Sequence, residues 1–118
     1  MDANFSIDPE PRLNLMRVRM SGFFSGADVG AFSTAYRAGL AALQPNQLTL
    51  VDITEMKIQA QDIVGAFASM LATPEIRSRK LAFVCGSTLA RLQAQRLTDR
   101  PGVEFFRTVE DAEAWLFA

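Results

Sequence analysis

Two residue types that many enzymes depend on are scarce in this sequence, which has no histidine and a single cysteine, Cys85. The lack of histidine excludes a Ser-His-Asp triad, a Cys-His dyad and histidine ligands to a metal. One cysteine cannot form an intrachain disulfide, which fits a reducing compartment, and it makes a zinc site unexpected. We therefore expect no metal and no other cofactor.

Charge of one sign and long apolar runs are also lacking. With 12 basic and 13 acidic residues the net charge is −1, so nothing suggests a nucleic-acid partner. No apolar run approaches the roughly 18 residues of a membrane span. The first residues, Met1-Asp2-Ala3-Asn4, have neither the basic nor the apolar region of a signal peptide. These features predict a cytoplasmic protein.

Strand and helix patterns alternate through the 118 residues, a length that predicts one domain over 1–118. Strand patterns occupy residues 4–8, 13–21, 48–54, 80–85 and 103–107. Helical periodicity follows each strand from the second onward, including a helix over 62–72. The order β-β-α-β-α-β-α-β-α predicts an α/β protein. We expect a single mixed, mostly parallel five-stranded sheet with (βα) superhelical crossovers.

The second strand alternates between an apolar side and a side that carries two arginines. Met16, Val18 and Met20 share one face, and Leu15, Arg17 and Arg19 share the other. We expect this second face to be solvated or covered by a partner. Since the first strand should be a sheet edge, pairing into a homodimer is a reasonable expectation.

Polar side chains follow the apolar run of the central strand, at its join with the next helix. Asp52 and Thr54 would lie at the carboxyl end of that strand, where ligands and partners bind in open α/β sheets. The alternative for Asp52 is a structural role, in which its carboxylate accepts hydrogen bonds from the adjoining loop.

A second polar join, Gly86-Ser87-Thr88, follows the fourth strand. Backbone N–H groups at such a turn into a helix can hold an anion. The alternative is that Gly and Ser serve only the turn, as they do at many strand-to-helix junctions. No GxGxxG sequence and no P-loop lysine motif accompanies it.

This order of elements resembles the STAS domain (sulphate transporter and anti-sigma-factor antagonist), and more closely the SpoIIAA-like bacterial proteins grouped with it. The resemblance covers nearly the whole chain. It is carried by the second strand ending in Ser-Gly-Phe-Phe, by Leu50-Val51-Asp52-Ile53-Thr54, and by the segments 81–87 and 105–112. It implies a (βα) superhelix with a mixed sheet and a regulatory role through protein partners.

The resemblance fails at one position that matters for regulation. In STAS antagonists the central strand reads Asp-Leu-Ser, and a serine at the start of the next helix is phosphorylated by an anti-sigma kinase. Asp52-Ile53-Thr54 matches the first part, but residues 55–68 contain neither serine nor threonine. The usual phosphoacceptor serine is therefore missing.

Three functions remain to be compared. The first is a non-catalytic interaction module whose unknown protein partner meets Gln59, Gln61, Asp62 and the following helix turn. The second is a carrier of a small apolar or lipid-like ligand, as in Sec14-type topology, with a pocket of Phe23, Phe24, Phe32, Phe67 and Met70; core packing is the alternative for these side chains.

An enzyme is the third possibility. Asp52 and Glu55 could pair as acid and base, and Cys85 could act as a nucleophile at a strand end. Neither has a base or an orienting histidine nearby in the sequence, and Cys85 fits a small core residue. We therefore expect no enzymatic activity.

Overall fold

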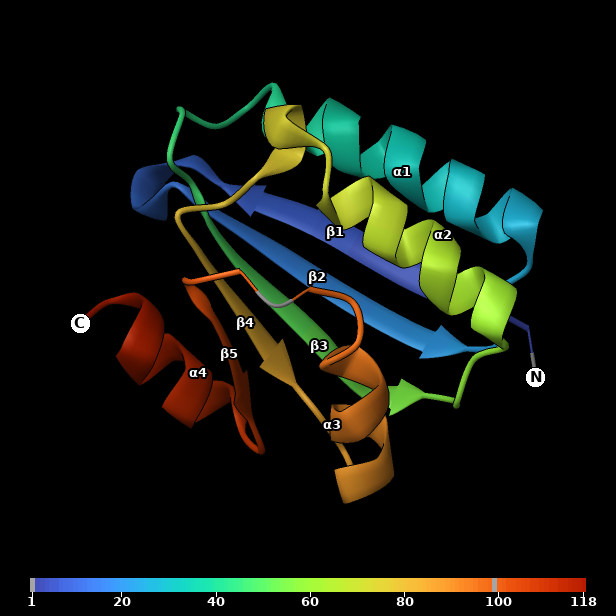
Figure 1. Ribbon diagram of the computed structural model, residues 1–118. Coiled ribbons are helices and arrows are strands. Elements are labelled where there is room, and N and C mark those ends of the chain that lie inside the picture. Colours follow the sequence, from blue (N-terminus) through green and yellow to red (C-terminus); the bar gives the residue numbers. More distant parts are fainter. Residues whose placement is uncertain (1, 99) are drawn as a thin grey trace.

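The computed structural model describes residues 2–98 and 100–118, which form alternating strands and helices (Figure 1). The strands are β1 (Asn4–Glu10), β2 (Leu15–Gly22), β3 (Leu48–Met56), β4 (Lys80–Val84) and β5 (Val103–Phe106). The α-helices are α1 (Gly26–Leu40), α2 (Gln61–Leu71), α3 (Thr88–Ala94) and α4 (Val109–Leu116), and two short 3₁₀ turns are η1 (Pro11–Leu13) and η2 (Pro74–Ile76).

The strands form one sheet in the order β1-β2-β3-β4-β5. β1 is antiparallel to β2, and the other neighbouring pairs are parallel. This confirms the predicted fold class and element order. Because β2 to β5 are parallel, their carboxyl ends lie at one end of the sheet, together with the loops that lead into the four helices.

The helices divide unequally between the two faces of the sheet. One face packs against α1, α2 and the end of α3 in a large apolar cluster that includes Met20, Phe32, Phe67 and Ala94. The other face is covered by α4 alone, through Ala112 and Leu116 packed on Leu15, Leu50 and Val84. α4 is too short to cover all five strands. Part of the sheet face on which α4 packs therefore stays open over β1 and β2.

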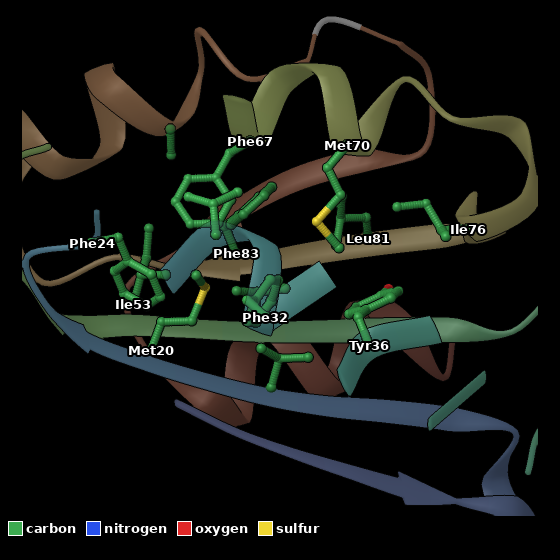
Figure 2. Close-up of a cluster of buried hydrophobic side chains, with 14 of the residues drawn as sticks. Met20, Phe24, Phe32, Tyr36, Ile53, Phe67, Met70, Ile76, Leu81 and Phe83 are labelled. Carbon is green, nitrogen blue, oxygen red and sulfur yellow. The ribbon is translucent and has the colours of Figure 1, made fainter. Parts of the chain in front are cut away.

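Aromatic rings lock α1 and α2 together (Figure 2). The Phe67 ring of α2 meets the Phe24 and Phe32 rings edge-on, with centroid distances of 5.4 and 5.9 Å. Edge-to-face pairs of this kind add to the stabilisation that burial alone gives. The residues expected to line a ligand pocket are thus mostly packed against one another.

A capping box fixes the start of α1. Ser25 Oγ accepts a hydrogen bond from the Asp28 N–H, and the Ser25 N–H donates to Asp28 Oδ2 at 2.8 Å. This reciprocal capping box satisfies two backbone donors that the helix itself leaves free. It fixes how the chain turns from β2 into α1.

Strand bounds differ from the sequence prediction where proline occurs. β1 continues to Glu10, with Pro9 opposite Met16, and β2 begins at Leu15 because η1 fills the turn. An edge strand tolerates proline where the missing N–H would have faced solvent. β3 is also longer than expected and runs to Met56.

The face of Leu15, Arg17 and Arg19 is only partly open, which corrects the expectation of an uncovered surface. Leu15 is fully buried beneath α4. Arg17 donates to Glu10 at 2.9 Å and to Glu113 of α4 at 3.2 Å. Arg19 stays exposed, and α4 therefore covers an area that sequence periodicity alone had left without a neighbour.

Candidate functional site

The predicted site residues fall on both faces of the sheet. Side chains alternate along β3, so that Leu50 packs toward α4 whereas Val51 and Ile53 pack toward α1 and α2. By the same alternation Asp52, which pairs with Arg19 of β2, belongs to the α4 side. Beyond Asp52 a register shift between β2 and β3 interrupts the alternation. The loop after β3 leads instead to α2 on the opposite side, so the structure separates Asp52 from Gln59, Gln61 and Asp62. Gly86, by contrast, approaches Thr54 closely.

Asp52 supports the end of its own strand. Its Oδ1 accepts hydrogen bonds from the Thr54 N–H at 3.0 Å and from the Thr54 hydroxyl at 2.7 Å. This is the local arrangement by which aspartate stabilises a turn. Thr54 is exposed and Asp52 is half-buried.

Gln59 lies at the centre of the opposite side, and its side chain is buried and fully hydrogen-bonded. Its Oε1 accepts from the Phe24 N–H at 2.8 Å, and its Nε2 donates to the carbonyls of Gly22, at 2.9 Å, and Lys57. A buried amide with every group paired rigidifies the segments it joins. Gln59 therefore holds the loop after β3 against the loop after β2 and does not face solvent.

Gln93 of α3 completes this arrangement, and the sequence had not suggested it. Its side chain accepts from the Gln59 N–H and donates to the Gln59 carbonyl, at 2.9 and 3.0 Å. A glutamine in a helix usually indicates a solvated position. Only the fold brings residues 34 positions apart into contact, so no local signal could have identified this pair.

Gln61 and Asp62 form the exposed first turn of α2. The N-cap residue is Ala60, which offers no side-chain hydrogen bond. An alanine cap leaves the first backbone donors of the helix to solvent or to a partner.

Gly86 is required by a close approach of two strands. A Cβ atom there would lie 2.7 Å from the Thr54 carbonyl oxygen, closer than any side chain tolerates. Ser87 then caps α3, because its Oγ accepts from the Ala90 N–H at 3.0 Å. Thr88 follows as the first residue of α3 and is exposed.

These three residues line a hollow of about 460 Å³ beside β5. Arg91 of α3 and Arg107 after β5 also line it, together with Cys85, Phe105 and Phe106. The hollow is open and polar at its rim. Arg91 and Arg107 add positive charge beside Gly86-Ser87-Thr88, the turn at which the sequence suggested that an anion could bind.

Cys85 is a buried core residue at the bottom of this join. Burial raises the pKa of its thiol to about 11, although the nearby Arg91 charge acts in the opposite direction. A reactive cysteine needs a lowered pKa so that thiolate is present at neutral pH. The environment of Cys85 has the reverse effect.

A crevice of about 70 Å³ lies between α2, α3 and the loop after β3. Three of the five residues expected in a ligand pocket line it, namely Phe32, Phe67 and Met70, whereas Phe23 and Phe24 do not. An engineered cavity that binds benzene measures about 150 Å³, so this crevice is too small for a lipid chain in its present shape.

Within residues 2–98 and 100–118, no cluster of three or more cysteine, aspartate or glutamate side chains could hold a metal ion. No helix in that part of the chain is long and apolar enough to cross a membrane.

Two of the solved structures that this chain resembles are bacterial proteins. An uncharacterised protein of the DUF3478 family with a SpoIIAA-like fold, from Shewanella loihica PV-4, matches with a TM-score of 0.74 and 20% identity, over 98% of this chain and 96% of that one. An anti-sigma factor antagonist from Mycobacterium paratuberculosis matches with a TM-score of 0.68 and 13% identity, over 99% and 96%. No model of a known protein family and no curated protein matches. The chain therefore has the SpoIIAA-like fold.

Proposed function

We propose that the protein is a non-catalytic, STAS-like regulatory module that binds a protein partner at the start of α2. The observation that carries this proposal is the exposed turn of Gln61 and Asp62, which follows a loop held in place by the buried Gln59. A surface that is already rigid loses little conformational entropy when a partner binds. One structural neighbour is an anti-sigma factor antagonist, which also supports a protein partner.

The chemistry at this end of the sheet supports a role in binding. The Cys85 thiol is buried with a raised pKa, and Asp52 is hydrogen-bonded to the end of its own strand. The N-cap residue of α2 is Ala60, which has no hydroxyl group. The proposed module is therefore not controlled by phosphorylation at that position. Cys85 is a free, buried thiol, and thiols stay reduced in the cytoplasm. We therefore propose that the partner is a cytoplasmic protein.

The proposal is tested by charge reversal at Asp62 with a matched control at Glu75. Glu75 is an exposed carboxylate in η2, beyond the far end of α2. Immobilised wild type, Asp62→Arg and Glu75→Arg would be incubated with extract of the source cells, and retained proteins quantified by mass spectrometry. We expect a partner to be retained by wild type and Glu75→Arg and lost with Asp62→Arg. Equal retention by all three would contradict the proposed surface.

A carrier of a small apolar ligand is a second candidate, supported by the apolar crevice between α2 and α3. Its volume requires the loop after β3 to move before anything larger than a few carbon atoms can enter. Native mass spectrometry of untagged protein tests this candidate. Extra mass on each subunit would support a carrier, and a bare subunit would count against it.

Self-association is a further proposal that rests on β1, which is an edge of the sheet. The open part of the α4 face over β1 and β2 carries Ser6, Asp8 and Arg19, which are exposed and polar. We therefore propose that any homodimer pairs through the β1 edge and not through that face. Light scattering should then report a monomer when proline replaces Ser6.

A further inference from the structure

Four large apolar side chains at the carboxyl end of the sheet are exposed although they lie close to the core. The exposed fractions are 52% for Phe23, 41% for Ile58, 61% for Leu89 and 53% for Leu92. Single exposed apolar residues are common, but a group of them usually marks an interaction site. Figure 1 places α3 and the loops after β2 and β3 at the same end of the sheet.

Hydrogen bonds hold the three segments that carry these side chains next to one another. The Gln59 side chain bonds to the backbone on both sides of Phe23, at Gly22 and Phe24. Ile58 directly precedes Gln59, and Leu92 directly precedes Gln93, which bonds to the Gln59 backbone. Leu89 lies one helical turn before Leu92. We name Phe23, Ile58, Leu89 and Leu92 the apolar surface.

The charges beside the apolar surface are of one sign along α3. Residues 86–98 contain Arg91 and Arg96 and no acidic residue. Lys57 precedes Ile58, and all three cations are exposed. Among the described residues, none of the three takes part in an ion pair. On the other side of the loop, Asp62 stands at the start of α2.

We propose that the apolar surface docks an amphipathic helix of a partner protein, with carboxylates along the flank that faces α3. The proposal rests on the proposed function and names the partner element that the module would bind. The surface belongs to a helix and two loops, so an added β-strand would find no strand edge along it. An amphipathic helix instead places apolar residues at three- and four-residue spacings into such a surface.

The charge arrangement defines which flank of the partner is acidic. Carboxylates facing Arg96 and Lys57 would pair with cations that take part in no ion pair within the described residues. The opposite flank would carry hydrogen-bond donors toward Asp62, which agrees with the loss of binding expected for Asp62→Arg. The apolar stripe between the two flanks would supply most of the affinity, because burying a leucine contributes more than an exposed ion pair.

Two synthetic helical peptides of about 18 residues, long enough to be partly helical alone, test the proposal. Both peptides carry the same stripe of leucines, with glutamine residues along one flank of the stripe. The peptides differ only in the other flank, which carries glutamate in the first peptide and lysine in the second. Binding to ¹⁵N-labelled protein would be followed by chemical-shift changes. We expect the glutamate peptide to bind at least about tenfold more tightly, with shifts at Ile58, Leu89 and Leu92.

The matched variants are Leu89→Gln with Leu92→Gln, and Leu13→Gln as control. Leu13 is 48% exposed in η1, at the opposite end of the sheet. The double variant should weaken peptide binding by at least about tenfold, since it removes two apolar contacts, and the control should leave it unchanged. All three leucines are exposed, so the variants should fold as the wild type does.

Other results would overturn the proposal. Equal binding of both peptides would refute the acidic flank, and no shift change at millimolar peptide would refute the helix. Binding to phosphatidylglycerol vesicles alone would indicate a membrane surface. A dimer that the double variant dissociates would indicate a second copy of the chain. If the double variant still retains the partner that Asp62→Arg loses, this inference fails while the proposed function stands.

Discussion

Gln59 and Gln93 exchange two hydrogen bonds, in which the backbone N–H and carbonyl of Gln59 are both satisfied by the side-chain amide of Gln93. The side chain of Gln59 then reaches the other way, to Gly22 and Phe24. One residue therefore joins the loop after β2, the loop after β3 and α3. The exposed turn of α2 begins two residues later, so its position depends on this connection.

Replacing Gln59 should destabilise the protein because its buried side chain joins the loops after β2 and β3 by hydrogen bonds. Gln59→Ala leaves the Phe24 N–H without its partner, and a buried unsatisfied group costs about 1–3 kcal/mol. The Gly22 carbonyl loses one of its two hydrogen bonds and keeps the one from the Lys57 N–H. We expect the free energy of unfolding to fall by about 2–4 kcal/mol in urea denaturation. Gln61→Ala, at an exposed position, should change it by about 0.5 kcal/mol or less. A similar small change for both variants would contradict the central role of Gln59.

Gly86 should not tolerate even a methyl group. A Cβ atom would meet the Thr54 carbonyl oxygen at 2.7 Å, and both atoms belong to neighbouring strand ends that cannot move independently. Gly86→Ala should lower the free energy of unfolding by about 1–3 kcal/mol. Gly65→Ala is the control, because its Cβ meets nothing within 4 Å on α2. That variant should gain up to about 1 kcal/mol through helix propensity. If Gly86→Ala were as stable as wild type, the close approach would be wrong.

Leu116, the last residue of α4, and Phe117, which follows it, test which side of this helix packs on the sheet. Leu116 is 1% exposed and packs on β3 and β4, whereas Phe117 is 46% exposed. Leu116→Ala should cost about 2–5 kcal/mol because it leaves a cavity, measured by thermal or urea unfolding. Phe117→Ala should cost well under half of that. The reverse order would mean that α4 presents a different side to the sheet.

The Cys85 thiol should react slowly and should make stability depend on pH in alkaline solution. Its pKa is raised by burial from 9.0 to about 11, so at pH 8 the folded protein has about a hundredfold less thiolate than the unfolded chain. Labelling by a thiol reagent should be slower in the folded state by at least that factor. Fast labelling at pH 8 would show that the thiol is accessible and activated.

The sign of the pH effect follows from the direction of the shift. A raised pKa means that the folded state keeps its proton while the unfolded state loses it between pH 9 and about 11. The contribution of Cys85 to stability is therefore complete below pH 9 and is lost as the pH rises through about 11. The difference in unfolding free energy between wild type and Cys85→Ala should shrink over this interval, and a constant difference would contradict the shift.

The sequence predicted the order of the elements and the sheet because each strand and helix has a local pattern. The capping box of Ser25 and Asp28 is a local pattern of the same kind, since both partners lie within one helical turn. The division of the site was not visible in the same way. Asp52 and Gln59 are only seven residues apart, yet the sheet lies between the surfaces they serve.

Contacts between distant segments explain most of what the sequence could not predict. The Gln59–Gln93 pair and the cover that α4 gives to Leu15 both join elements far apart in the chain. The leucines of α3 show the opposite difficulty, because Leu89 and Leu92 had the spacing of a buried stripe and are exposed. Periodicity reports that a helix has an apolar side, but not whether the chain itself covers that side.

Site-specific cross-linking in living source cells tests the central claim, that a protein partner binds at the start of α2. A photoreactive phenylalanine would replace Gln61 in one variant and Glu75 in another, both exposed positions near opposite ends of the same helix. We predict that a defined protein partner becomes linked from position 61 and not from position 75. Linking from position 75 alone, or the same products from both positions, would contradict the account.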